Sequence, residues 1–169
     1  ILFGTPAPVV GQANLGVLRE DMVNVIVHGH EPILSEMIVA ASQTPEIIEY
    51  AKAAGANGVN LAGICCTANE ILMRQGVPAA GNFLHQELAI LTGAVEAMVV
   101  DVQCIMQALV GLAENFHTKV ITTSPKVQIK GATHIEFEEH KAMTIAKEIL
   151  KVAIDNFKNR GTTEIPNVV

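Results

Sequence analysis

Residues 22–30 read MVNVIVHGH, and this stretch decides how the rest of the sequence is interpreted. Its short apolar run, rich in β-branched residues, predicts a buried strand that ends at His28-Gly29-His30. Two similar runs follow, VNLAGI at residues 59–64 and AMVVDV at residues 97–102, and a cysteine lies just past each of them. The sequence therefore predicts three strands with reactive side chains near their carboxyl ends.

Longer periodic segments separate these runs and predict helices. The last one has apolar residues every three or four positions, as a helix packed on a sheet requires. Gly76 follows the helix that ends at Gln75, where it can serve as a C-terminal cap. The expected helices span residues 33–41, 44–54, 67–75, 85–91, 105–115 and 138–159, with further strands at 119–123 and 134–137 and a loop at 78–82.

Regular alternation of strands and helices predicts a parallel sheet with right-handed crossovers. We expect an α/β fold of one Rossmann-like domain, with an open sheet of four to five or more strands flanked by helices. Residues 21–160 form this cluster-binding domain in our interpretation, residues 1–20 a lead-in segment and residues 161–169 a linker.

Composition narrows the function classes. The chain has 169 residues, half of them apolar, a mean hydropathy of +0.37 and a net charge of −6. We expect no nucleic-acid partner, because no basic stripe is present, and no membrane span, because no apolar run approaches 18 residues. The chain begins at Ile1 without a signal-like leader, as an excised fragment would. High hydropathy fits a buried parallel sheet or a surface that a partner covers.

The most informative pattern is the position of His30, Cys66 and Cys104. Each follows a consecutive expected strand, with spacings of 36 and 38 residues, about one strand–helix–strand unit. Ligands of open α/β sheets bind outside the carboxyl ends of the strands. Cys66 and Cys104 also precede expected helices, whose N-termini favour negative charge. These three residues are therefore candidate metal ligands.

The residues alone leave alternatives open. A single buried cysteine is most often a small core residue. His28 competes with His30, although its apolar surroundings favour a hydrogen-bonded structural role. Cys65 competes with Cys66, although Thr67–Glu70 has the form of a capping box that would leave Cys66 just outside the helix.

Other polar residues give weaker signals. Asp101 and Glu31 could support neighbouring ligands, although a surface or capping role explains them equally well. The remaining histidines are expected at the surface: His85, His117, His134 and His140.

Several common sites are unsupported. The first expected strand is followed by HGHEP and not by G-x-G-x-x-G, so a dinucleotide site is not indicated. The sequence contains neither a phosphate-binding G-x-x-x-x-G-K-[ST] loop nor a C-x-x-C motif. Three cysteines, two of them adjacent, do not suggest a disulfide framework and fit a reducing compartment.

Four stretches carry a specific resemblance to a known family. They are VNVIVHGHEPILSEMIV (23–39), GVNLAGICCTANEILMRQGVP (58–78), QELAILTGAVEAMVVDVQCIMQ (86–107) and HTKVITTSPK (117–126). The chain closely resembles the catalytic subunit of anaerobic nickel–iron carbon monoxide dehydrogenases, from about Leu15 to Pro166. HGH, GICCT and DVQC in this order and spacing are highly specific, and they indicate the middle, Rossmann-like segment of that subunit.

The resemblance implies a site and a reaction. A cluster of nickel, iron and sulfide would catalyse CO + H2O ⇌ CO2 + 2 H⁺ + 2 e⁻. His30 and Cys66 would bind the iron outside the cubane, Cys104 would bind a cubane iron, and nickel would bind CO. Further cysteines, including the nickel ligand, and further [4Fe-4S] clusters would come from other parts of the subunit. Thiolate and imidazole suit such a cluster, and a mixed His/Cys iron leaves a position open for hydroxide.

The resemblance also implies a cytoplasmic homodimer that passes electrons to a carrier such as a ferredoxin. We expect the isolated chain to be inactive, because three ligands cannot hold the whole cluster. Two alternatives remain: a redox domain like that of the hybrid-cluster hydroxylamine reductases, and a non-catalytic metal-binding or association module.

Overall fold

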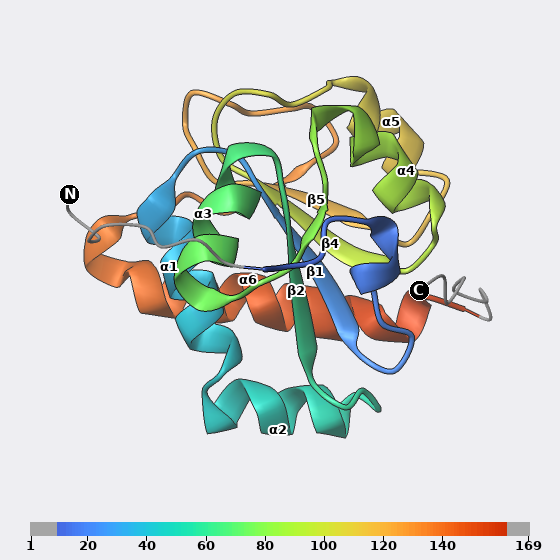
Figure 1. The fold of residues 1–169 in the computed structure, drawn as a ribbon, viewed down its shortest axis with the longest axis vertical. Coiled ribbons are helices and arrows are strands. Elements are labelled where there is room, and N and C mark those ends of the chain that lie inside the picture. The colour runs from blue at the N-terminus through green and yellow to red at the C-terminus, as the bar shows by residue number, and fades with distance from the viewer. Residues whose placement is uncertain (1–9, 162–169) are drawn as a thin grey trace.

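The computed structural model describes residues 10–161. The described chain forms one sheet of six parallel strands, in the order β3-β2-β1-β4-β5-β6, flanked by helices on both faces (Figure 1). This confirms the predicted α/β class, and the strand order is that of a Rossmann fold. The strands are β1 (Val23–His28), β2 (Val59–Ile64), β3 (Ala79–Gly81), β4 (Val95–Val100), β5 (Lys119–Thr122) and β6 (Thr133–His134).

The helices connect these strands. They are α1 (Pro32–Ser42), α2 (Pro45–Ala53), α3 (Cys65–Gln75), α4 (Gln86–Leu91), α5 (Ala108–Ala113) and α6 (Ala142–Asn156), with 3-10 turns η1 (Leu15–Val17), η2 (Phe83–His85), η3 (Glu139–Lys141) and η4 (Phe157–Asn159). Gly76 ends α3 in the left-handed conformation, as the sequence predicted. The expected linker at 162–169 and residues 1–9 of the lead-in lie outside the described residues, so the proposed domain boundaries stay a prediction.

Strand β1 lies at the centre of the sheet, and all six of its residues are buried. Alternate side chains serve two cores because successive residues of a strand face opposite sides. Val25 belongs to a cluster that includes residues of α1, α2 and α6, whereas Ile26 belongs to a cluster with α4 and α5. Figure 1 shows α4 and α5 together on the side of the sheet away from α6. Burial on both faces explains the continuous apolar run that identified β1.

Several elements differ from the expectations. Strand β6 ends at His134 and not at Phe137, and α6 begins at Ala142, after the 3-10 turn η3, and not at Glu138. Residues 78–82 were expected to be a loop, but they contain β3, which pairs in parallel with β2. Its small residues, Ala79 to Gly81, give no apolar alternation from which a strand could be recognised. The helix expected after Cys104 begins only at Ala108, because turns occupy the intervening segment.

Candidate metal centre

The sheet topology brings the candidate residues to one edge. His30 follows β1, Cys65 and Cys66 open α3 directly after β2, and Cys104 follows β4 by four residues. The strand order reverses between β1 and β4, and such a switch point is where open α/β sheets bind their ligands. The three loops therefore meet at the position where a site is expected.

Hydrogen bonds join these loops to one another. The backbone N–H and the hydroxyl of Thr67 both donate to the carbonyl oxygen of Gly29, at 3.1 and 2.6 Å. The N–H of Asp101 donates to the carbonyl of His28 at 3.4 Å, and the carboxylate of Asp101 accepts from the N–H groups of His30 and Glu31. The residues that flank His30, Cys66 and Cys104 thus form one connected unit.

The ring of His30 is held in a defined tautomer. Its Nδ1 lies 3.0 Å from the carbonyl oxygen of Val102. A carbonyl oxygen can only accept, so Nδ1 carries a proton, and in the neutral imidazole the lone pair is on Nε2. Histidines that bind metals commonly donate their second ring nitrogen to a carbonyl or carboxylate in this way.

The cysteines occupy unusual backbone conformations. Cys65 and Cys104 have φ angles of 67° and 55°, and Gln103, next to Cys104, has a φ of 65°. They are the only non-glycine residues with positive φ among residues 10–161. Such conformations cost of order 1 kcal/mol or more each and cluster at functional sites.

Cys66 and Cys104 are exposed and Cys65 is half-buried. Burial raises the pKa of the Cys65 thiol, and the neighbouring Cys104 and Cys66 raise it further. Cys66 and Cys104 therefore present accessible thiols, whereas the thiol of Cys65 is partly covered.

His28 differs from the expectation of a hydrogen-bonded structural residue. Its side chain is 1% exposed, and neither ring nitrogen has a hydrogen-bond partner among the described residues. Burial lowers the pKa of His28 to about 4, and the charge of Asp101 only partly opposes this effect. The buried imidazole is therefore neutral at pH 7, with both nitrogens unused in the described structure.

The expected capping box is wrong. Helix α3 begins at Cys65, and Ile64, the last residue of β2, takes the N-cap position. The Thr67 hydroxyl is bound to Gly29, and Glu70 pairs with Arg74 at 3.4 Å. Cys66 therefore lies inside the first turn of the helix, not before it, and the local argument that favoured it over Cys65 does not hold.

One further surface assignment is wrong, because the His117 side chain is 6% exposed and lies 2.9 Å from Glu96. His134 is exposed, as expected, and its Nδ1 lies 2.9 Å from the Thr122 hydroxyl. Glu31, by contrast, has the capping role considered for it, because its carboxylate accepts from the N–H of Ile33 at the start of α1.

Sequence reasoning missed two residues that shape the site. Gln86 is fully buried, and its amide donates to the carbonyl of Cys104 at 2.8 Å. Gly29 has a φ of 134°, and a Cβ there would overlap the carboxylate of Asp101. A glycine between two histidines was the available signal for a close approach, whereas Gln86 lies in an ordinary helical pattern.

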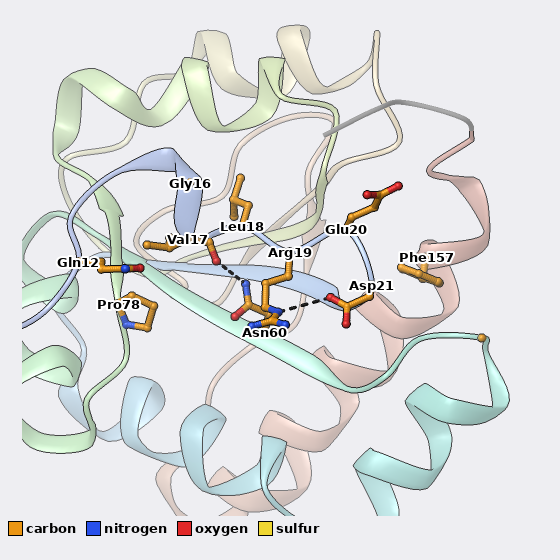
Figure 2. Close-up of a pocket in the computed structure, with 11 residues that line it drawn as sticks. Gln12, Gly16, Val17, Leu18, Arg19, Glu20, Asp21, Asn60, Pro78 and Phe157 are labelled. Carbon is orange, nitrogen blue, oxygen red and sulfur yellow. Dashed lines mark hydrogen bonds and ion pairs between the residues drawn. The ribbon is translucent and has the colours of Figure 1, made fainter. Parts of the chain in front are cut away.

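The described side chains do not close a metal site by themselves. Within residues 10–161, no three His, Cys, Asp or Glu side chains are grouped so that they could hold a metal ion. A cavity of about 780 Å³ lies elsewhere, at the amino ends of β1 and β2 (Figure 2). Its lining includes Arg19, Asp21 and Asn60 but no cysteine or histidine. At the candidate centre, Cys66 and Cys104 are exposed.

The chain is therefore a Rossmann-like α/β domain, with thiols and an imidazole at the switch point beyond the carboxyl ends of its strands. The chain belongs to the prismane/CO dehydrogenase family, whose model matches residues 1–169. This confirms the family resemblance seen in the sequence.

Individual relatives agree. Carbon monoxide dehydrogenase 1 of Methanosarcina mazei is 59% identical over 165 residues, which are 98% of this chain and 26% of that protein. The as-isolated, Ni-free crystal structure of carbon monoxide dehydrogenase from Thermococcus sp. AM4 matches with a TM-score of 0.94 and 59% identity, over 98% of this chain and 26% of that one. A chain also matches from a structure of acetyl-CoA synthase/carbon monoxide dehydrogenase that describes NiZn[Fe4S4] and NiNi[Fe4S4] clusters in closed and open alpha subunits. The TM-score is 0.92 and the identity 52%, over 98% of this chain and 25% of that one.

The chain spans about a quarter of the length of these relatives. Among the described residues, no helix is long and apolar enough to cross a membrane.

Proposed function

We propose that this chain is the segment of an anaerobic carbon monoxide dehydrogenase that supplies His30, Cys66 and Cys104 to a nickel–iron–sulfur cluster. The full subunit oxidises CO with water to CO2, two protons and two electrons. It works in the cytoplasm as a homodimer and passes its electrons to a carrier such as a ferredoxin. The family membership and the relatives named carbon monoxide dehydrogenase support this proposal.

One observation carries the proposal: the Nδ1–H of His30 is engaged by Val102, which leaves Nε2 available for a metal. The donor types fit the cluster, because thiolates bind iron–sulfur clusters and neutral imidazole binds iron or nickel. Three ligands are too few to hold the whole cluster, and the described residues do not form a metal site by themselves. Relatives about four times as long have further residues that can supply the missing ligands. The remaining ligands come from the rest of the subunit.

The residues of this chain would perform three tasks. His30 offers Nε2 from a loop fixed by Asp101 and Val102, and Cys66 offers an accessible thiol on the first turn of α3. Cys104 offers a thiol from a loop whose backbone Gln86 holds. When bound, the cluster supplies CO binding, activation of water and acceptance of two electrons.

The test uses substitutions in the full-length subunit. His30→Ala and Cys66→Ala should abolish CO-dependent reduction of a viologen dye and lower the iron and nickel content. His28→Ala and Cys65→Ala are the matched controls, one on each loop, and should leave more activity. The reverse ranking would refute the ligand assignment.

The isolated chain gives a second test. We expect no CO oxidation by it, even after reconstitution with iron, sulfide and nickel, and we expect concentration-dependent association in sedimentation. Zinc alone in the purified chain would instead favour a structural metal module. Measurable CO oxidation, or a monomer at high concentration, would contradict the interpretation as part of a larger subunit.

A further inference from the structure

Asp101 lies at the junction of two of the loops that form the candidate centre. It follows the last residue of β4 and is 5% exposed. Its carboxylate accepts hydrogen bonds from the N–H of His30, at 2.9 Å to each oxygen, from the N–H of Glu31 at 2.6 Å, and from the N–H of Val102. One side chain thus binds the backbone on both sides of the switch point, and hydrogen bonds to a charged acceptor are roughly twice as strong as neutral ones.

Gly29 makes this arrangement possible. The carboxylate of Asp101 lies so close to the α-carbon of Gly29 that any Cβ would overlap it, and the φ of 134° also disfavours other residues. The backbone of the HGH segment therefore passes directly over the carboxylate, and the N–H groups that follow it point at the two oxygens. Position 29 is a glycine because a side chain there would overlap the carboxylate of Asp101.

The same short loop also fixes the imidazole. The carbonyl that receives Nδ1–H of His30 belongs to Val102, the residue after Asp101. Asp101 therefore holds the backbone of His30 at one end, and its neighbour holds the ring at the other. The first contact fixes the position of the His30 backbone, and the second fixes the orientation and tautomer of the ring.

We propose that Asp101 is the positioning residue for His30: its carboxylate clamps the His30 backbone over the β4 loop so that Val102 can fix the ring with Nε2 directed to the metal. This inference rests on the proposed role of His30 as an iron ligand. It assigns Asp101 no contact with substrate or metal.

The test is Asp101→Asn in the full-length enzyme, because asparagine keeps the size of the side chain but replaces one acceptor by an NH2 that cannot accept from N–H groups. The control is Asp155→Asn, the same change on α6, where Asp155 accepts from the Tyr50 hydroxyl at the exposed surface. Two quantities are measured: kcat for CO oxidation, and the imidazole ¹⁴N hyperfine coupling of the paramagnetic cluster by pulsed electron paramagnetic resonance. Loss of a residue that orients a metal ligand commonly costs 10- to 100-fold in activity or metal affinity.

We expect Asp101→Asn to lose about 10- to 100-fold in kcat and to show a weakened or altered ¹⁴N coupling, with Asp155→Asn unchanged in both. A wild-type coupling and wild-type kcat in Asp101→Asn would overturn the proposal.

A double substitution covers the case in which Asp101→Asn fails to hold the cluster. If Asp101 acts on the metal through His30, Asp101→Asn/His30→Ala should match His30→Ala alone in iron and nickel content. A further loss in the double variant would show a general structural role and would overturn the proposal. If instead the wild-type ¹⁴N coupling survives His30→Ala, the proposed ligand role of His30 has failed, and this result does not depend on Asp101.

Discussion

Buried polar groups are bonded differently at the two ends of the parallel strands. We call the side of the sheet where the strands begin the amino edge, and the side where they end the carboxyl edge. At the amino edge, Glu96 is fully buried, and its carboxylate is bound by Arg160 at 2.6 and 2.8 Å, by the N–H of Asn24 at 2.5 Å and by His117 at 2.9 Å. At the carboxyl edge, His28 is buried without a hydrogen-bond partner among the described residues, and the cysteine loops hold the three non-glycine residues with positive φ.

The difference separates stability from function within one domain. The amino edge satisfies its polar groups internally, and Asn156 adds bonds to the carbonyls of Glu96 and His117, at 2.8 and 2.5 Å. The carboxyl edge has strained backbone conformations, accessible thiols and imidazole nitrogens without hydrogen bonds among the described residues. Strained conformations persist only where the surrounding structure enforces them. Natural proteins depart from local rules mainly at functional sites, so this contrast independently marks the carboxyl edge.

The largest effect should come from breaking the amino edge. In Glu96→Gln, the buried guanidinium of Arg160 would lose the charge of Glu96, and removing one partner of a buried ion pair costs about 3–5 kcal/mol. We expect a loss of about 3 kcal/mol in the free energy of unfolding, measured by urea denaturation of the chain. A loss below about 1 kcal/mol would show that this network does not hold the edge together.

A second prediction compares the two ends of strand β1. His28 and Asn24 lie on the same face of the strand, and both are at most 1% exposed. Asn24 donates to the carbonyls of Arg19 and Ala94, at 2.7 and 2.9 Å, whereas His28 has no such bonds among the described residues. A buried group without a partner costs about 1–3 kcal/mol, and replacing it by an apolar one removes that cost.

His28→Leu should therefore leave the stability of the chain unchanged or raise it by about 1 kcal/mol, whereas Asn24→Leu should lower it by about 2 kcal/mol. Urea unfolding of the two variants side by side gives the comparison. If His28→Leu were the more damaging change, the carboxyl edge would depend on the His28 imidazole as much as the amino edge depends on Asn24.

The comparison also shows what the sequence could predict. The strands β1, β2 and β4 were recognisable because burial on both faces leaves an apolar run, and their parallel order placed His30, Cys66 and Cys104 at one edge. The amino edge was not recognisable, because Glu96 and Arg160 are 64 residues apart and only the fold brings them together. His117 was misassigned for the same reason.

Within the site, partners were harder to predict than positions. The spacing located the loops, but it could not show that Thr67 binds Gly29 and so cannot cap α3. A hydrogen bond between loops overrode a local motif there. The choice of Cys66 over Cys65 stays a prediction that the substitutions above test.

The smallest effect should come from an ion pair outside both edges. Glu46 joins α2 to α6 by accepting from Lys147 at 2.6 Å and from Lys151 at 2.7 Å. These lysines lower the pKa of Glu46 to about 2 from its ordinary value of 4.5. Because the folded-state pKa is the lower one, the contribution to stability is present above about pH 4.5 and is lost as the pH falls toward 2. Exposed pairs of this kind contribute little and are screened by salt.

Glu46→Gln should therefore shift the urea midpoint only slightly at pH 7, and the difference from the unsubstituted chain should shrink in 1 M salt and between pH 4.5 and 2. Glu148→Gln, the same change on α6, controls for the loss of a negative charge from an acidic chain. The decisive comparison is with Glu96→Gln, in which an identical substitution removes a carboxylate that no solvent reaches. If Glu96→Gln and Glu46→Gln lowered the free energy of unfolding equally at pH 7, the buried network around Glu96 would stabilise the chain no more than a surface ion pair does. The proposed difference between the two edges would then depend only on the features of the carboxyl edge.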